Sequence, residues 1–214
     1  MNAADRESLA RRVAADLKDG DYVNLGIGLP VLVANYVAND IDVIYESENG
    51  LLGVGPAPAA DDVDLELINA SKQPVTLRAG ASIFDTTTSF MMIRGGHIDI
   101  ALLGAYEVAE NGDLANWTTN ELDRPPAVGG AMDLAAGAKH VWVMMEHCTS
   151  DGRPRLLSRC TYPLTAARVV SRIYTDLAVI DIDHGFVVRE LRGGVTFNEL
   201  QSRTGAPLKL STTS

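Results

Sequence analysis

Hydrophobic residues along the chain gather in short unbroken runs that have the length of strands. The runs are YVNL (22–25), DVIYESE (42–48), VTLRAGA (75–81), IDIALLGA (98–105), HVWVMMEH (140–147) and TDLAVIDI (175–182). A strand that is apolar at nearly every position is buried on both faces, as happens when helices cover both sides of a parallel sheet.

Helical patterns alternate with these runs. Leu9, Val13 and Leu17 recur at four-residue spacing and predict a helix that ends near Gly20. Two further helices are predicted, at 31–38 and at 83–94. Helices that alternate with buried strands predict an α/β fold, with an open, mostly parallel sheet and helices on both faces. We expect residues 1–214 to form one domain.

The composition limits the classes of protein to which this chain can belong. With 214 residues, 46% of them hydrophobic, the chain can build a core on both sides of such a sheet. The formal net charge of −10 disfavours nucleic-acid binding. The N-terminal segment lacks a signal-peptide pattern, and no apolar run has the length of a membrane span. Cys148 and Cys160 do not make a disulfide framework, so we expect a cytoplasmic protein.

Two glycine-rich stretches follow predicted strands. In GIGLP (26–30), Gly26 and Gly28 stand at a strand's carboxyl end, where open α/β sheets bind ligands. A dinucleotide fingerprint requires a glycine at position 31, which is valine here, so a plain strand-to-helix turn is the alternative. NGLLGVGP (49–56) lacks the ending of a phosphate loop, and its glycines allow a close approach or a positive φ.

A third glycine pair, Gly129 and Gly130 in VGGAMDLAAGA, precedes a short helical segment. Free amides at a helix start suit an anion or a developing oxyanion, and a tight loop is the equal alternative. Polar loops are predicted at 55–66, 119–126 and 151–155.

The other residues with potential chemistry indicate no metal site or hydrolase. The four histidines, His97, His140, His147 and His184, are scattered, and a structural role is favoured over metal binding for them. The serine-hydrolase motif G-x-S-x-G is absent from the sequence.

Two glutamates end the second predicted strand in YESENGLLGVG (45–55). Glu46 and Glu48 are placed on the same side of the strand by alternation, with Glu48 at its tip. An ionised carboxylate is a nucleophile that needs no general base, and it suits an activated acyl group such as a thioester. Spacing alone does not choose between the two glutamates.

Several segments in this order resemble the β chains of the family I 3-oxoacid CoA-transferases. They are GIGLP, SENGLLGVGP, IRGGHIDIALLGA, GDLANW and GGAMDL, and the resemblance extends to about Pro207. Two more, PAVGGAMDLA and CTYPLT…SRIYTDLAV, are most similar to the branch that acts on 3-oxoadipate. The branches that act on acetoacetate or acetate are slightly less similar.

The resemblance implies a site and a reaction. SENG carries the family's nucleophile, which is Glu48 in this sequence. Substrate or CoA contacts are expected from a set of residues near the glycine loops: Gly26, Gly28, Asn49, Gly50, Gly53 and Gly55. The resemblance implies an oxyanion role for Gly129 and Gly130, no cofactor beyond the CoA thioester substrate, no metal, and a CoA-transferase α subunit that completes the site.

The acceptor and the reaction class each have an alternative. The resemblance implies transfer of CoA from succinyl-CoA to 3-oxoadipate, and acetoacetate is the competing acceptor. Arg94 and His97 are weak candidates to bind the second carboxylate of 3-oxoadipate. A sugar-phosphate isomerase or sensor module and a nicotinamide-dependent oxidoreductase are alternatives of other classes. A phosphate-binding module would need a lysine or arginine by the glycine loops, and none lies between Asp19 and Lys72. The incomplete G-x-G-x-x-G motif at 26–31 argues against the oxidoreductase.

Overall fold

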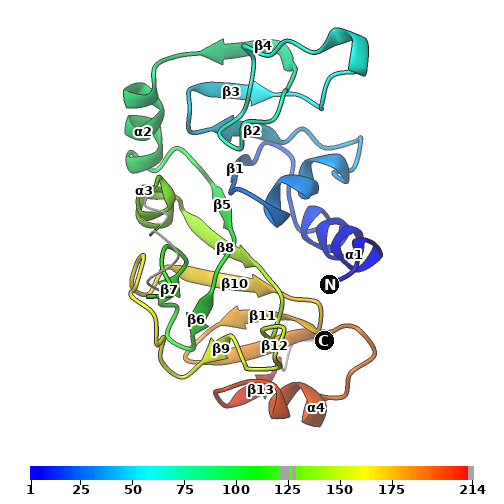
Figure 1. Cartoon of the computed structure of the whole chain (residues 1–214), viewed down its shortest axis with the longest axis vertical. Coiled ribbons are helices and arrows are strands. Elements are labelled where there is room, and N and C mark those ends of the chain that lie inside the picture. Colours follow the sequence, from blue (N-terminus) through cyan, green and yellow to red (C-terminus); the bar gives the residue numbers. More distant parts are fainter. Residues whose placement is uncertain (121–125, 127–128, 212–214) are drawn as a thin grey trace.

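The computed structural model describes residues 1–120, 126 and 129–211, and it contains one long sheet with helices on both faces (Figure 1). The strands of this sheet are β1 (Tyr22–Leu25), β2 (Ile44–Ser47), β3 (Leu51–Val54), β4 (Leu77–Ile83), β5 (Ile100–Leu103), β8 (His140–Met144), β10 (Val170–Tyr174), β11 (Ala178–Ile182), β12 (Phe186–Leu191) and β13 (Leu208–Leu210). A smaller sheet contains β6 (Glu107–Ala109), β7 (Leu114–Ala115) and β9 (Leu156–Leu157). The helices are α1 (Ala3–Ala14), α2 (Thr86–Arg94), α3 (Ala131–Gly137) and α4 (Phe197–Ser202), with 3-10 helices η1 (Leu29–Asn35) and η2 (Ala60–Asp62).

The centre of the long sheet is parallel. Its strand order is β13-β12-β11-β10-β8-β5-β1-β2-β3-β4. The five strands from β10 to β2 pair in parallel. Antiparallel pairing adds β3 and β4 on one side and β11 and β12 on the other, where β13 then pairs with β12 in parallel. The carboxyl ends of the parallel strands therefore share one edge, which is where an open α/β sheet places its ligands.

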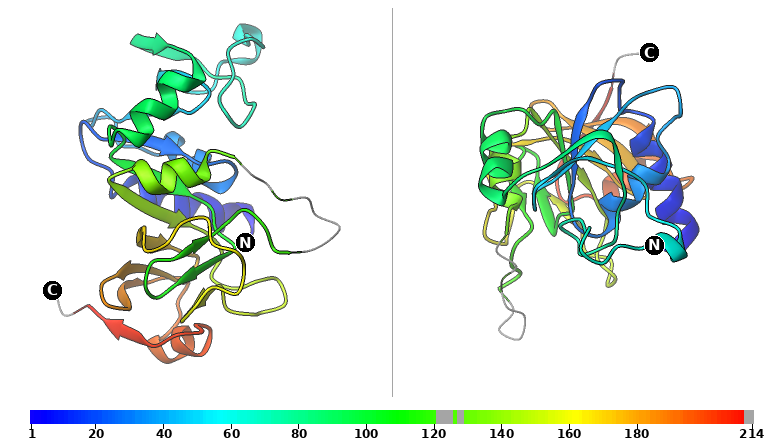
Figure 2. Two further views of the ribbon diagram at one scale, coloured as in Figure 1. Left: turned by 90° about the vertical axis from the view of Figure 1, so that its left-hand side faces the viewer. Right: turned by 90° about the horizontal axis from the view of Figure 1, so that it is seen from above.

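Two hydrophobic cores lie on opposite faces of the sheet. Figure 2 shows α2 and α3 on one face and α1 on the other. Ile93 of α2 and Leu134 of α3 are buried in the first core, while Leu9 and Val13 of α1 are buried in the second. Burial on both faces explains why most positions of the central strands are apolar, and the predicted α/β class with helices on both faces is confirmed.

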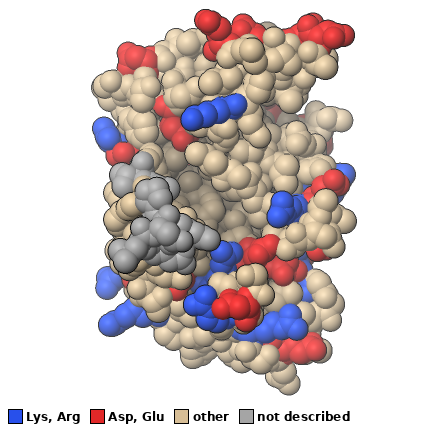
Figure 3. Space-filling model, viewed as in Figure 1, with Lys and Arg blue, Asp and Glu red and all other residues tan. Residues whose placement is uncertain are grey.

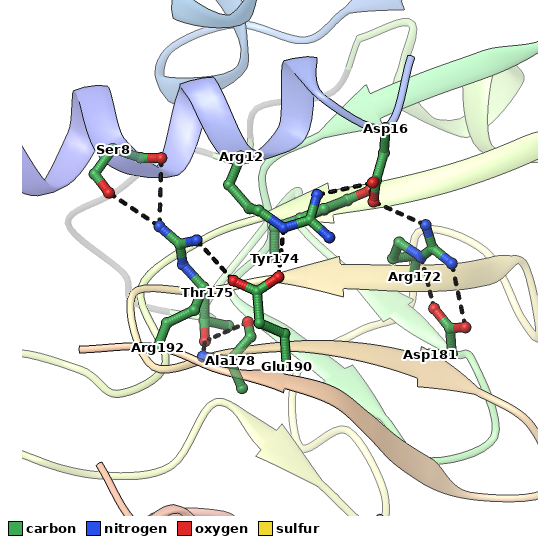
Figure 4. Close-up of polar contacts among 10 residues, drawn as sticks. All are labelled: Ser8, Arg12, Asp16, Arg172, Tyr174, Thr175, Ala178, Asp181, Glu190 and Arg192. Carbon is green, nitrogen blue, oxygen red and sulfur yellow. Dashed lines mark hydrogen bonds and ion pairs between the residues drawn. The ribbon is translucent and has the colours of Figure 1, made fainter. Parts of the chain in front are cut away.

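A network of ion pairs attaches α1 to the C-terminal half of the sheet (Figure 4). Arg12 of α1 binds both Asp16 and Glu190 of β12. Arg172 of β10 bridges Asp16 and Asp181 of β11. Because these side chains are partly buried and each carboxylate is paired, the network fixes the helix against the strands that flank it.

The structure corrects one local prediction and adds detail to two others. Gly20 does not end the first helix, because α1 stops at Ala14 and the chain continues in turns that keep Leu17 buried. The strand predicted at 175–182 is present as β11, and it is antiparallel to both neighbours because β10 and β11 form a hairpin. The glycine-rich segment at 49–56 contains the strand β3, which was not predicted, and its Gly50 and Gly53 have the positive φ that the sequence allowed.

Other features agree with expectation or lie outside the described part of the chain. The helix expected at 31–38 is the 3-10 helix η1, with Pro30 in its first turn. The predicted loop at 119–126 lies mostly outside the described residues. No helix among the described residues combines the length and apolarity needed to cross a membrane.

Candidate active site

Polar side chains from three separate segments meet where β1 and β2 end. Asn24 on β1 is the parallel neighbour of Glu46 on β2. Both are buried, with 0% and 3% of their surface exposed. Ser89 of α2 is also buried and covers them from the helix side. A polar cluster of this kind inside an apolar sheet is costly unless its members are hydrogen-bonded.

Hydrogen bonds connect the cluster to Glu48. The Nδ2 atom of Asn24 donates to Oε2 of Glu46 at 2.6 Å and to Oε2 of Glu48 at 3.2 Å. The hydroxyl of Ser89 donates to Oε1 of Glu46 at 2.6 Å. Both glutamates therefore lie on the same side of β2, as strand alternation predicted.

The two glutamates differ in their surroundings. Glu48 lies in the turn after β2 and is partly exposed, so an incoming substrate can reach its carboxylate. Glu46 is enclosed. Burial raises the pKa of the Glu46 carboxyl above its ordinary value, hydrogen bonds from Ser89 and Asn24 oppose that rise, and the charge of Glu48 adds to it. Only Glu48 combines hydrogen-bonded anchoring with access.

Gly50, which follows Glu48 and Asn49, lies where two segments of the chain cross closely. Gly50 has a φ of +118°, and a Cβ at this position would lie 2.0 Å from the carbonyl oxygen of Phe84. The amide of Phe84 donates to the carbonyl of Gly50 at 3.0 Å. Only glycine fits this crossing of two chain segments, and the crossing sets the position of the turn that carries Glu48.

The predicted glycine pair before α3 lies beside the same carboxylate. A Cβ on Gly130 would be 3.7 Å from Cγ of Glu48 and 2.9 Å from Cζ of Phe90. Gly129 is exposed and has open space around it. The start of α3 thus reaches the turn that carries Glu48, although more than 80 residues of chain separate them.

Most of the other residues predicted to contact substrate or CoA pack against or bond to neighbouring parts of the chain. A Cβ on Gly26 would meet the carbonyl oxygen of Leu102 at 2.9 Å. Gly53 lies against Ala81 of β4, and Gly55 lies against Thr76, just before β4. The side chain of Asn49 donates to the carbonyl of Ile68 at 2.7 Å. Gly28 has a φ of +93° with open space around it.

A cavity of about 450 Å³ adjoins this region. Its walls come from η1, from β2 and from the segment between β3 and β4, and they include Leu32, Tyr45, Ser47 and Val75. Figure 3 shows that the face of the molecule is hollowed near its centre, with a floor that is mainly neither acidic nor basic. Both features suit a ligand with a long, largely uncharged portion.

Sequence reasoning missed Asn24 and Ser89. An asparagine inside the short apolar strand YVNL was a usable signal, because a buried polar residue requires a partner. Ser89 follows three threonines and carries no such signal.

The structure does not bring Arg94 or His97 to Glu48. Arg94 ends α2 and pairs with Asp133 at 2.7 Å. His97 precedes β5, near the amino end of β1, whereas Glu48 follows the carboxyl end of β2. The Arg94 guanidinium is thus already paired in this chain and lies over the ring of Phe90, and among the described residues no hydrogen bond or ion pair joins Arg94 or His97 to Glu48.

His147 is buried away from the site. Its ring nitrogens bond the hydroxyls of Thr175 and Thr204 at 3.1 and 3.0 Å. Desolvation lowers the pKa of His147 to about 4. Among the described residues, no group of three or more His, Cys, Asp or Glu side chains is placed to hold a metal ion.

The family model and the curated relatives indicate one family. Residues 6–196 match the family model described as Coenzyme A transferase. The chain is 55% identical over 204 residues, 95% of each chain, to the β subunit of the 3-oxoadipate CoA-transferase of Pseudomonas putida. It is 47% identical to the β subunit of the succinyl-CoA:3-ketoacid coenzyme A transferase of Helicobacter pylori strain 26695, over 96% of this chain and 99% of that one.

A solved structure shares the fold. The acyl-CoA transferase of Escherichia coli O157:H7 superposes with a TM-score of 0.74 at 18% identity, over 97% of this chain and 42% of that one. The fold therefore recurs in a chain of very different sequence.

Proposed function

The chain belongs to the coenzyme A transferase family, and from this premise we propose that it is the β subunit of an enzyme that moves CoA from succinyl-CoA to 3-oxoadipate. The observation that carries the proposal is the position of Glu48, held by Asn24 at the tip of β2 and next to Gly130. The similarity to the Pseudomonas putida protein supports 3-oxoadipate as the acceptor.

The proposed reaction begins with attack by Glu48. A carboxylate oxygen forms a bond to the thioester carbon of the acyl-CoA, the carbon–sulfur bond breaks, and CoA leaves as a thiolate. The thiolate then attacks the glutamyl carbonyl of the mixed anhydride, which releases the donor acid as a carboxylate and leaves a Glu48–CoA thioester. The 3-oxoacid acceptor reverses these steps. Because the overall reaction consumes one thioester and forms another, the transfer needs no ATP.

The surrounding residues have separable roles in this proposal. Asn24 orients the Glu48 carboxylate by donating to Oε2. The backbone amides of Gly129 and Gly130 are proposed to stabilise the oxyanion that forms on the acyl or glutamyl carbonyl. Loss of one such donor typically lowers the rate on the order of 100-fold or more. The cavity between η1 and β2, with the open turn at Gly28, is proposed to bind part of the CoA chain.

We propose that an α subunit completes the site, because the relatives with similar length are named as one of two kinds of subunit. Exposed apolar side chains support a partner surface near the site. Ile83 at the end of β4 and Met91 on α2 are each 67% exposed, and Met132 on α3 is 39% exposed. These residues lie on the elements that flank Glu48, where a covering subunit would also exclude water.

Acetoacetate is the second candidate acceptor, favoured by the similarity to the Helicobacter pylori protein. The two acids differ by the terminal carboxylate of 3-oxoadipate. Because Arg94 already pairs with Asp133, we propose that another cation binds this carboxylate. We expect a cation from the α subunit or from another part of this chain to fill that role.

The experiment is a comparison of kcat/KM for 3-oxoadipate and acetoacetate, with succinyl-CoA as donor and this chain co-expressed with its α subunit. We expect a clear preference for 3-oxoadipate. A preference for acetoacetate would reject the proposed acceptor but retain the reaction class. Absence of CoA transfer to either acid would reject the proposed function.

A further inference from the structure

Two carboxylates at the site share one amide donor. The Asn24 side chain donates one N–H to Glu46 and the other to Glu48. No arginine, lysine or histidine of the described residues forms an ion pair with Glu46. The amide oxygen of Asn24 is buried without a hydrogen-bond partner among the described residues. Within the described part of the chain, the two negative charges thus lie together without a compensating cation.

We propose that Glu46 is a positioning residue that orients Asn24 toward Glu48 and whose charge favours conversion of the Glu48 carboxylate into the neutral CoA thioester. This inference rests on the proposed function and adds a role for a residue outside the SENG motif.

The orientation follows from hydrogen-bond chemistry. An ionised carboxylate only accepts hydrogen bonds, so Glu46 requires the NH₂ group of Asn24 rather than its carbonyl oxygen. With one N–H held by Glu46, the second N–H is directed at Oε2 of Glu48. Because both carboxylates accept from the Asn24 nitrogen, its amide oxygen is left buried without a hydrogen-bond partner among the described residues, which is an expected cost of this orientation.

The effect of charge follows from the balance of the first half-reaction. Acyl-CoA and the Glu48 carboxylate give the free donor carboxylate and the Glu48–CoA thioester. One negative charge therefore leaves the protein for solution, and Glu46 remains as the single carboxylate on the Asn24 amide. A like charge nearby raises the free energy of an ionised carboxylate, so Glu46 shifts this equilibrium toward the covalent intermediate.

Glu46→Gln tests the charge with little change of shape. The glutamine oxygen can accept from Asn24 while its NH₂ group donates to the hydroxyl of Ser89. Glu46→Asp keeps the charge but shortens the side chain. Glu107 supplies the matched control, because it is also buried (7% exposed) and accepts bonds from Thr161 and Tyr162.

The measurement is the equilibrium constant for formation of the CoA adduct. Each variant is assembled with the α subunit and mixed with fixed ratios of succinyl-CoA to succinate at about pH 8, and intact mass gives the adduct fraction. We expect Glu46→Gln to lower the constant on the order of tenfold, the effect of about one pKa unit on a neighbouring carboxylate. Glu46→Asp and Glu107→Gln are expected to stay within about threefold of wild type, well short of that effect.

A merely structural role for Glu46 would change thermal stability without changing this ratio. The proposal is overturned if Glu46→Gln and wild type give the same constant, or if Glu46→Asp falls as far as Glu46→Gln. Neither result would affect the proposed function, which fails instead if the wild-type chain forms no adduct.

Discussion

Shortening the proposed nucleophile by one methylene, in Glu48→Asp, tests how strictly the turn after β2 positions its carboxylate. In the structure, Oε2 of Glu48 lies 3.2 Å from Nδ2 of Asn24. Aspartate withdraws the carboxylate by roughly 1 Å, which would extend this contact to about 4 Å, beyond hydrogen-bond range. The attacking oxygen would also recede from the thioester. A misplacement of this size costs ~100-fold in rate, which corresponds to about 2.7 kcal/mol in the activation free energy.

The assay is steady-state CoA transfer by the assembled enzyme, with kcat and kcat/KM measured separately. We expect both to fall on the order of 100-fold for Glu48→Asp, because the lost contact serves the reacting carboxylate rather than substrate binding. Glu66→Asp makes the same chemical change at an exposed loop position and should leave the rate unchanged. The reasoning would be refuted if Glu48→Asp kept activity within about fivefold of wild type, since the turn would then not limit the geometry.

Three further predictions concern assembly, the turn and acid stability. The purified chain without a second polypeptide should show no CoA transfer, and full turnover by this chain alone would contradict the need for an α subunit. Gly50→Ala places a Cβ 2.0 Å from the Phe84 carbonyl oxygen, so it should lower the unfolding free energy by at least roughly 2 kcal/mol in denaturant titrations. Gly20→Ala is the control, because φ is also positive there but the space is open, and it should have a smaller effect. The depressed pKa of His147 means that the folded chain disfavours its protonation, so stability should be full above the unfolded value of 6.5 and decline as pH falls toward about 4. His147→Gln should weaken that decline in thermal melts, whereas His184→Asn at an exposed site should not; equal slopes for wild type and His147→Gln would count against the assignment.

The central strands could be predicted from the sequence because their burial is encoded locally. Apolar runs at 22–25, 98–105 and 140–147 contain β1, β5 and β8. Their burial on both faces leaves little choice of residue type, so the pattern is clear. The strand β3 was not predicted, because the local sequence does not show that its Gly53 lies against Ala81 of β4.

The motif predicts which glutamate is the nucleophile, but the environment of Glu48 depends on tertiary contacts. Asn24, Glu46 and Ser89 are brought together by strand register and by the packing of α2, and neither is visible in the spacing of these residues. Gly130 reaches Glu48 only because α3 packs beside α2. These contacts depend on the order of the strands in the sheet, which no local sequence pattern specifies.

The location of the covalent intermediate tests the central claim most directly. The assembled enzyme is incubated with succinyl-CoA in the absence of acceptor, digested, and analysed by peptide fragmentation on either side of Ser47. We predict the mass of CoA less water on Glu48, reduction of that thioester to an alcohol by borohydride with loss of activity, and no adduct in Glu48→Ala. CoA attached to Glu46, or labelling that persists in Glu48→Ala, would contradict the assignment of Glu48 as the nucleophile.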